Sequence, residues 1–241
     1  MRKVIAIAGE KEAGKDAFAN SLTKRGFQQG SFAHNLKEMC KSIFNLTEHM
    51  INTPEGKKMR LSVPRRFTSK HFLLIRRWMG RTHDLTGLAE ECRRIEEEYI
   101  HRPIKQTGKP TELFTAREIL QFVGTDICRR LIDTYHVDVL FQRITNSPEN
   151  WVITDARFEN ERRRLKEEFE AILVRIVRPG KESLDAHPSE NSLGEESEYD
   201  YVVENNGTLE ELNDKARMFY EESVKKVPEA QRIIHGSESN Q

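Results

Sequence analysis

Short apolar runs alternate along this chain with longer segments in which apolar residues recur every three or four positions. The runs at residues 4–8, 151–155, 171–177 and 201–203 read as strands, and residues 27–33 are a further strand candidate. The intervening segments predict helices over residues 17–25, 35–46, 115–133, 136–144, 161–169 and 208–227. Thr115 and Glu118 predict a capping box at the start of one of these helices. Strands that alternate with helices favour a parallel sheet with helices on both faces, so the pattern predicts an α/β fold.

One long stretch, residues 47–112, breaks this alternation. Between residues 56 and 83 it holds nine Lys or Arg residues and no Asp or Glu, and residues 90–98 then turn acidic. We therefore expect an inserted, partly helical segment that stands apart from the core of a single domain over residues 1–226, followed by a flexible tail at 227–241. Three interpretations of the basic run stay open: a solvated face, a lid over polyphosphate, or a nucleic-acid surface.

The overall composition narrows the class of protein. The 241 residues carry 39 Lys or Arg and 39 Asp or Glu, so no global attraction to nucleic acid or to an anionic membrane is implied. No apolar run approaches the length of a membrane-spanning helix, and the first residues lead directly into a strand, so we expect a cytoplasmic protein with no membrane partner. Three scattered cysteines predict reduced thiols, and the eight histidines show no metal-binding spacing.

The most specific motif directly follows the first strand. Residues 9–15 read Gly-Glu-Lys-Glu-Ala-Gly-Lys, the G-x-x-x-x-G-K spacing of a phosphate-binding loop between a strand and a helix. Glycines let the backbone turn so that its N–H groups face phosphate oxygens, and Lys15 adds a charge near the β- and γ-phosphates. The usual next residue is a Ser or Thr that binds magnesium, and this chain has Asp16 instead. The motif predicts that a nucleotide phosphate binds here.

A polar set on the predicted helix at 115–133 is a second candidate site. Arg117, Gln121, Asp126 and Arg129 follow one another at spacings of three to five residues, so much of the set can share one side of the helix. Gly124 lies within the same helix, where it costs about 1 kcal/mol relative to alanine. A close ligand, a close neighbouring helix and an ordinary kink would each explain it.

A third candidate site lies at the end of the strand at 151–155. Asp155 places a carboxylate at the carboxyl end of a buried strand, and in open α/β sheets ligands bind at that edge. With a phosphate-binding loop upstream, Asp155 is a candidate to bind magnesium or to position a nucleophile, and Arg157 and Glu161 follow closely. The alternative for Asp155 is a helix N-cap.

Further sequence blocks occur in order along the chain. They are Ser31-Phe32-Ala33-x-x-Leu36-Lys37, Arg117-x-x-Leu120-Gln121-x-x-Gly124-Thr125-Asp126-x-x-Arg129, Asp155-x-Arg157-x-x-x-Glu161, Val177-Arg178-Pro179-Gly180, His187-x-Ser189-Glu190 and Asn205-Asn206-Gly207-Thr208-Leu209-Glu210-Glu211-Leu212. Together with the phosphate-binding loop, they resemble the deoxynucleoside monophosphate kinases of tailed DNA bacteriophages. The resemblance covers about residues 1–46 and 113–226, and the inserted segment at 47–112 lies outside it.

The resemblance implies the P-loop nucleoside monophosphate kinase fold, with a parallel core of about five strands, flanking helices and a mobile lid; the inserted segment is lid-like. It also implies transfer of the γ-phosphoryl group of ATP to a deoxynucleoside 5′-monophosphate, in the service of DNA precursor synthesis. Magnesium would be required. If a phage encodes the protein, its location would be the host cell cytoplasm.

The resemblance further implies a role for each matching residue. The donor ATP would be bound by Gly9, Lys11, Ala13, Gly14, Lys15 and Asp16, with adenine held by backbone contacts at the turn that contains Asn205 and Gly207. The acceptor nucleotide would be bound by Lys37, Arg117, Gln121, Thr125, Asp126, Arg129 and Glu161. Catalysis would rest on Lys15, Asp16, Asp155 and Arg157, with Mg²⁺ near Asp16 and Asp155, directly or through water.

Two departures from the family pattern bear on the site. Ala17 offers no hydroxyl after the loop aspartate, and Val137 stands where relatives tend to have a Trp, so base preference can differ here. Two other functions stay open: a P-loop ATPase or switch associated with nucleic acid through the basic run, and a kinase of another small acceptor. The expected partners are nucleotides, without nucleic acid or membrane, and a homodimer stays open.

Overall fold

The chain folds into two compact units in the computed structural model, which describes residues 2–10, 12–101, 112–179 and 193–225. Unit 1 comprises Met1–Ser31 and Asn146–Gln241, and unit 2 comprises Phe32–Thr145. Each unit has its own hydrophobic core. Lys11, the His187–Glu190 block and the tail at 227–241 lie outside the described residues, so the expectations for them stay predictions.

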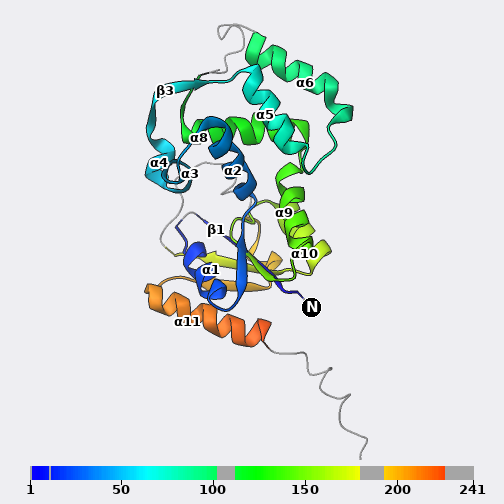
Figure 1. Cartoon of the computed structure of the whole chain (residues 1–241). Helices are drawn as coiled ribbons and strands as arrows, with labels where there is room; N and C mark the ends of the chain where they lie inside the picture. The colour runs from blue at the N-terminus through cyan, green and yellow to red at the C-terminus, as the bar shows by residue number, and fades with distance from the viewer. Residues whose placement is uncertain (1, 11, 102–111, 180–192, 226–241) are drawn as a thin grey trace, which may run out of the picture. The chain divides into compact units, whose positions relative to one another are not determined.

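Unit 1 is built on the five-stranded parallel sheet that the sequence predicts (Figure 1). Its strands are β1 (Val4–Gly9), β2 (Phe27–Gly30), β5 (Asn150–Ile153), β6 (Ile172–Val177) and β7 (Tyr201–Glu204). They lie in the order β2-β5-β1-β6-β7, and every neighbouring pair is parallel. The central strand β1 is buried along its whole length, which accounts for its unbroken apolar run.

Helices flank this sheet. They are α1 (Lys15–Thr23), α10 (Glu159–Phe169) and α11 (Leu209–Phe219), with the short helical turns η4 (Glu196–Glu198) and η5 (Tyr220–Val224). The helices α1 and α11 contact each other and bury their apolar sides with Ile5 and Ile7 of β1. The rings of Phe18 and Phe219 lie 5.7 Å apart in this layer. Helix α10 packs against β1 and β6 and buries Leu165.

The parallel arrangement brings the carboxyl ends of four strands to one edge of the sheet. The phosphate-binding motif follows β1, Asp155 follows β5, Arg178 follows β6 and Asn205 follows β7. This is the edge at which open α/β sheets bind ligands. Segments that are far apart in the sequence are therefore collected around the loop that the sequence singles out.

Unit 2 is mainly helical. Its elements are α2 (Ala33–Phe44), α3 (Glu48–Asn52), α4 (Pro54–Lys58), β3 (Arg60–Arg66), α5 (Ser69–Met79), η1 (Thr86–Leu88), α6 (Ala89–Glu96), η2 (Glu97–His101), β4 (Glu112–Thr115), α8 (Ala116–Gln121), η3 (Phe122–Arg129) and α9 (Tyr135–Thr145). The strands β3 and β4 pair as an antiparallel two-stranded sheet. Within the described ranges, we find no helix with the length and apolar character needed to cross a membrane.

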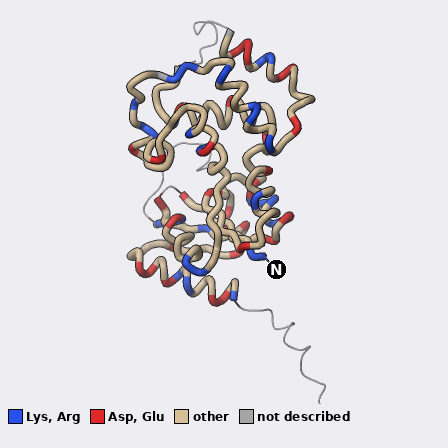
Figure 2. The backbone as a smooth tube through the Cα atoms, viewed as in Figure 1, with Lys and Arg blue, Asp and Glu red and all other residues tan. Residues whose placement is uncertain are grey.

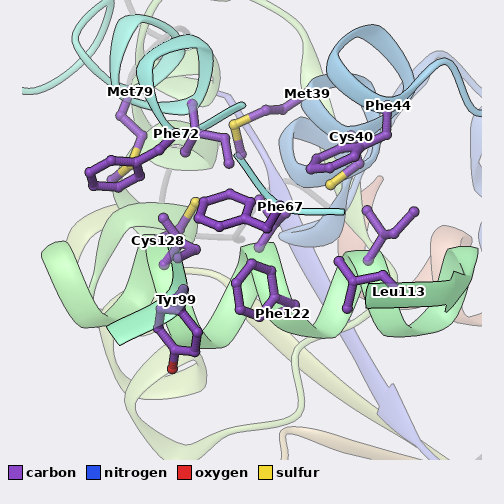
Figure 3. Packing of buried hydrophobic residues seen from close by; sticks show 14 of the residues in the cluster. Met39, Cys40, Phe44, Phe67, Phe72, Met79, Tyr99, Leu113, Phe122 and Cys128 are labelled. Carbon is purple, nitrogen blue, oxygen red and sulfur yellow. The ribbon is translucent and has the colours of Figure 1, made fainter. Parts of the chain in front are cut away.

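The core of unit 2 corrects one expectation for residues 47–112. This stretch does not stand apart from a core, because it supplies many of the buried side chains of unit 2 (Figure 3). They include Ile51, Leu61, Phe67, Phe72, Ile75, Met79, Cys92, Ile95 and Tyr99. The ring of Phe122 lies 4.9 Å from both Phe67 and Tyr99. Phe72, Ile75 and Met79 have amphipathic spacing within the basic run, and the prediction gave the charges more weight than this spacing.

The basic run at 56–83 begins at the end of α4 and includes β3 and α5 (Figure 2). Six of its nine cationic residues are exposed and three are half-buried. Three of them lie over aromatic rings of the same unit, since Arg60 is 4.6 Å from the ring of Phe114, Arg81 is 4.6 Å from the ring of Trp78 and Arg76 is 5.9 Å from the ring of Phe72. The charges therefore lie on the outside of a packed helical unit, as a solvated face does. The lid and nucleic-acid interpretations stay predictions.

Candidate functional site

The phosphate-binding loop has the backbone that its sequence requires. Gly9 and Gly14 take positive φ angles of 149° and 104°, and Glu12 between them has φ 62°. A Cβ atom on Gly14 would lie 2.6 Å from Nδ2 of Asn205 and 2.8 Å from a methyl group of Leu212. Glycine is therefore needed at residue 14 for its conformation and for the space around it.

Lys15 is the first residue of α1 and turns back over the loop. Its Nζ donates hydrogen bonds to the carbonyl oxygens of Gly9 at 2.7 Å and Glu10 at 2.5 Å. Asp16 follows in the first turn of α1 and is exposed. Three features of an anion-binding site thus occur together. They are the ammonium group of Lys15, the N-terminal amides of a nine-residue helix and a glycine in the left-handed conformation.

Asn205, which directly follows β7, holds this loop in place. Its side chain donates to the carbonyl oxygen of Ala13 at 2.8 Å, and its backbone N–H donates to Val177 at 2.7 Å. The resemblance implies that adenine is held by backbone contacts at this turn, which stays a prediction, and the Asn205 side chain itself holds the loop. Gly207 directly precedes Thr208, which caps α11 in a capping box with Glu211.

The segment after β5 carries Asp155 and Arg157, both half-buried. Pairing with β2 continues to Thr154, whose N–H donates to the carbonyl oxygen of Gly30 at 3.2 Å. Asp155 is not the N-cap of α10, because Phe158 holds that position. The carboxylate of Glu161 accepts the N–H groups of Arg157 at 3.0 Å and Phe158 at 3.1 Å. Glu161 is predicted to bind substrate, but in the structure it orders the backbone around Arg157.

The second set of predicted residues lies in unit 2, on α8 and η3. The capping box of Thr115 and Glu118 is confirmed. Arg117, Gln121 and Thr125 are exposed and four residues apart, so they follow one side of the helical segment. The turns of η3 are π-helical, a rare geometry that is often found at functional sites.

The half-buried residues of the predicted acceptor set, Asp126 and Arg129, also lie on η3. Asp126 accepts a hydrogen bond from the hydroxyl of Tyr99 at 3.2 Å, and Arg129 is half-buried three residues on. Lys37 lies on α2 and donates to the side chain of Asn52 at 3.1 Å. The set therefore offers donors and acceptors along α8 and η3, and one cation on α2.

Gly124 is explained by a neighbouring helix within unit 2. A Cβ atom there would lie 2.7 Å from a methyl group of Leu36 on α2. The carbonyl oxygen of Gly124 lies 3.3 Å from Nε2 of His136. Burial lowers the pKa of His136 to about 4, with a smaller lowering by Arg129, so the ring is neutral at pH 7. Of the open interpretations of Gly124, the structure supports helix approach.

The two carboxylates that are predicted to bind magnesium follow neighbouring strands of the sheet. Asp16 and Asp155 follow β1 and β5, which are neighbours in the sheet, and hard cations such as Mg²⁺ prefer carboxylate oxygens together with nucleotide phosphates. The three cysteines are free and buried, and burial raises the pKa of Cys128 to about 12. Such thiols are suited to packing rather than to nucleophilic chemistry.

Sequence reasoning missed the buried Arg162. It is one of three consecutive arginines on α10, and its neighbours Arg163 and Arg164 bind Glu167 and Glu168 in ordinary i,i+4 pairs. Nothing in the run distinguishes the buried arginine. The one available signal is its position next to Glu161, in the first turn of a helix that follows a candidate site.

The family model and the curated relatives that match this chain all carry the same kind of name. A family model described as deoxynucleotide monophosphate kinase matches residues 75–216. The chain is 31% identical over 224 residues to a protein of Acanthamoeba polyphaga mimivirus described as a putative deoxynucleotide monophosphate kinase. The match covers 87% of this chain and 91% of that protein. It is 26% identical over 228 residues to the deoxynucleoside-5′-monophosphate kinase of Escherichia phage T5, covering 80% and 86%. A match to the deoxynucleotide monophosphate kinase of Escherichia phage RB69 is 33% identical over 109 residues and covers 43% and 44%.

Proposed function

This chain belongs to the deoxynucleotide monophosphate kinase family, and on that basis we propose how its residues divide the reaction. The protein is a kinase that phosphorylates deoxynucleoside 5′-monophosphates to diphosphates, with ATP as the donor. The observation that carries the assignment to particular atoms is the phosphate-binding loop, where Lys15, Gly14 and the start of α1 come together. Phosphoryl transfer needs little covalent help, so these residues act by alignment and by offsetting charge.

The donor phosphates bind in the loop of unit 1. Lys15 exchanges the carbonyl oxygens of Gly9 and Glu10 for β- and γ-phosphate oxygens, and the amides at the start of α1 complete the cradle. Asn205 keeps the loop in shape through Ala13, and the Gly207 turn lies beside it for contact with the base. This arrangement depends on the strand order, because β1, β6 and β7 follow one another in the sheet and their carboxyl ends lie at the same edge.

Arg157 binds the phosphoryl group in transfer. A guanidinium group holds two phosphate oxygens at once, which suits a planar group that carries spread negative charge. Asp16 and Asp155 are the residues that would hold Mg²⁺, and the bound ion would offset charge on the donor phosphates. Glu161 contributes by ordering the backbone of Arg157.

The acceptor nucleotide binds to residues of unit 2. Arg129 binds its phosphate, and the exposed side of α8 and η3 supplies polar contacts from Arg117, Gln121, Thr125 and Asp126. Lys37 adds a cation from α2. The neutral His136 supports η3 at Gly124 without adding charge to this set. Val137 is buried, and base preference is expected to differ from that of relatives with a Trp at this position.

A substrate panel tests the function directly. Purified protein with ATP and Mg²⁺ is incubated with each deoxynucleoside and ribonucleoside monophosphate, and separately with single-stranded DNA, while nucleoside diphosphates are separated and quantified. We expect diphosphate from at least one deoxynucleotide, and loss of turnover when Mg²⁺ is chelated. ATP hydrolysis that needs no acceptor and rises with DNA would instead support an ATPase associated with nucleic acid.

A further inference from the structure

Two buried charges lie side by side at the start of α10. Among the described residues, Glu161 and Arg162 are the two charged side chains that are buried, each with 3% of its surface exposed. Burial of a charge is costly unless hydrogen bonds and an opposite charge compensate for it. Both residues therefore need an explanation in terms of what they bind.

Both charges bind the backbone of the same residue. The Glu161 carboxylate accepts the N–H of Arg157 at 3.0 Å, and Nη1 of Arg162 donates to the carbonyl oxygen of Arg157 at 2.6 Å. The two peptide groups that flank the Cα atom of Arg157 are thus both held by charge-assisted hydrogen bonds. Since these bonds restrict rotation around that Cα atom, they set the direction in which the Arg157 side chain leaves the backbone.

The other end of the Arg162 guanidinium is anchored just before β7. Its Nη2 donates to Oε2 of Glu198 at 2.6 Å, and its central carbon lies 5.4 Å from the centre of the Tyr199 ring. Arg162 lowers the pKa of Glu198, which keeps that carboxylate charged. A planar guanidinium can donate to the two acceptors in different directions, which the single ammonium group of a lysine does less well.

We propose that Arg162 is a positioning residue for catalysis, which anchors Arg157 to the segment before β7 so that its guanidinium is aligned with the phosphoryl group in transfer. The inference rests on the proposed role of Arg157. It assigns Arg162 no contact with either nucleotide. Misplacement of a catalytic group by about 1 Å can lower turnover by about 100-fold, so a small loosening of this anchor is enough to matter.

The test is a double-mutant cycle between Arg162→Lys and Arg157→Ala, measured as kcat and as KM for ATP and for the acceptor. We expect Arg157→Ala to lower kcat by about 1,000-fold or more. Arg162→Lys should lower kcat by about 10- to 100-fold in the parent protein and less than about twofold in the Arg157→Ala background, with KM for ATP within about twofold. A residue with a merely structural role would lower activity equally in both backgrounds.

Matched variants keep the test decisive. Arg163→Lys changes the exposed neighbour that pairs with Glu167, and its kcat should stay at the parent value. Glu198→Gln removes the negative charge that anchors Arg162, at a position with 41% of the side chain exposed. It therefore serves if Arg162→Lys does not fold, and it should show the same dependence on Arg157. Circular dichroism and melting curves identify variants that fold.

The outcomes separate two failures. Near-parent activity of Arg157→Ala would overturn the proposed role of Arg157 itself. If Arg157→Ala is impaired but Arg162→Lys and Glu198→Gln either leave kcat unchanged or lower it equally in both backgrounds, the positioning role of Arg162 is wrong. Loss that appears in the parent and disappears without Arg157 supports it.

Discussion

Unit 1 builds its core on one five-stranded parallel sheet, whereas unit 2 builds its core from short helices and a two-stranded antiparallel sheet. In unit 1 the proposed donor residues lie where strands end, and short motifs in the sequence identify them. In unit 2 the proposed acceptor residues lie along a helical segment whose shape depends on packing with α2. The comparison indicates that the backbone at strand ends follows from local sequence, while the surroundings of a packed helix depend on residues that are distant in the sequence.

The two units also differ in net charge. Unit 2 carries 20 Lys or Arg and 14 Asp or Glu, a net charge of +6, and the remaining 19 and 25 give unit 1 a net charge of −6. Unit 1 is nevertheless the one with the phosphate-binding loop. Its affinity for polyphosphate must come from local groups, namely Lys15, the loop amides and α1, rather than from its total charge.

The largest expected effect tests this local explanation in unit 1. Lys15→Ala removes the ammonium group that lies over the loop and should lower kcat/KM by about 1,000-fold, because the γ-phosphate loses this cation in the transition state. Steady-state kinetics with the best deoxynucleotide measures it. The melting temperature should stay close to that of the parent, and near-parent turnover would contradict the role of the loop.

The second prediction tests the packed core of unit 2. Phe72→Ala removes a fully buried ring within the basic run and should lower the free energy of unfolding by about 3–5 kcal/mol. The adjacent Leu73 is 63% exposed, so Leu73→Ala should change it by less than about 0.5 kcal/mol. Urea unfolding measures both. Equal, small effects would mean that this stretch does not belong to the core.

The third prediction separates recognition from stability on η3. Arg129→Ala should raise KM for the acceptor by about 10- to 100-fold, which corresponds to one lost charge-assisted contact, and should leave KM for ATP unchanged. Arg130 is the control, because it binds Glu91 at 2.5 Å and Glu98 at 2.6 Å within unit 2. Arg130→Ala should lower the melting temperature and leave KM for the acceptor near the parent value. The reverse pattern would reassign the two arginines.

The smallest predicted effect concerns pH and is confined to unit 2. The pKa of His136 is lowered from 6.5 to about 4, so below pH 6.5 the unfolded chain binds a proton that the folded protein does not. His136 therefore stabilises the fold fully above pH 6.5, and this contribution is lost as the pH falls toward 4. Between pH 7 and pH 5 we expect a loss of about 2 kcal/mol from this group.

His136→Gln isolates that contribution. Glutamine can still donate to the carbonyl oxygen of Gly124 but does not titrate, so the variant should lose about 2 kcal/mol less stability than the parent between pH 7 and pH 5. Urea unfolding at both pH values measures the difference. Parallel pH profiles for the two proteins would show that the ring is not kept neutral by burial.

Much of unit 1 could be predicted from sequence because its signals are local. An unbroken apolar run, two glycines and a lysine are enough to place the loop, and Asp155 follows from the end of a buried strand. Its supporting bonds could not be predicted. Asn205 reaches Ala13 only because β7 returns to the same sheet edge, and nothing in the sequence indicates that Glu161 binds the backbone amides of Arg157 and Phe158.

Unit 2 was harder because charge and packing give opposite signals. The run of nine cations suggests an exposed insertion, while Phe72, Ile75 and Met79 within it are buried. Gly124 shows the same difficulty, because the methyl group of Leu36 that excludes a side chain there comes from another helix. A pattern within one segment does not show which surface a different segment will cover.

The hydrogen bond between Asn205 and Ala13 joins residues 192 positions apart, and this separation has a consequence for synthesis. A ribosome makes β1 and α1 long before β7, but the bond that braces the loop between them needs the residue that directly follows β7. Contacts of such long sequence separation form late, since a long loop must close first. On a growing chain the loop would remain unbraced until translation had passed Asn205, so the brace would form only after β7 has been made.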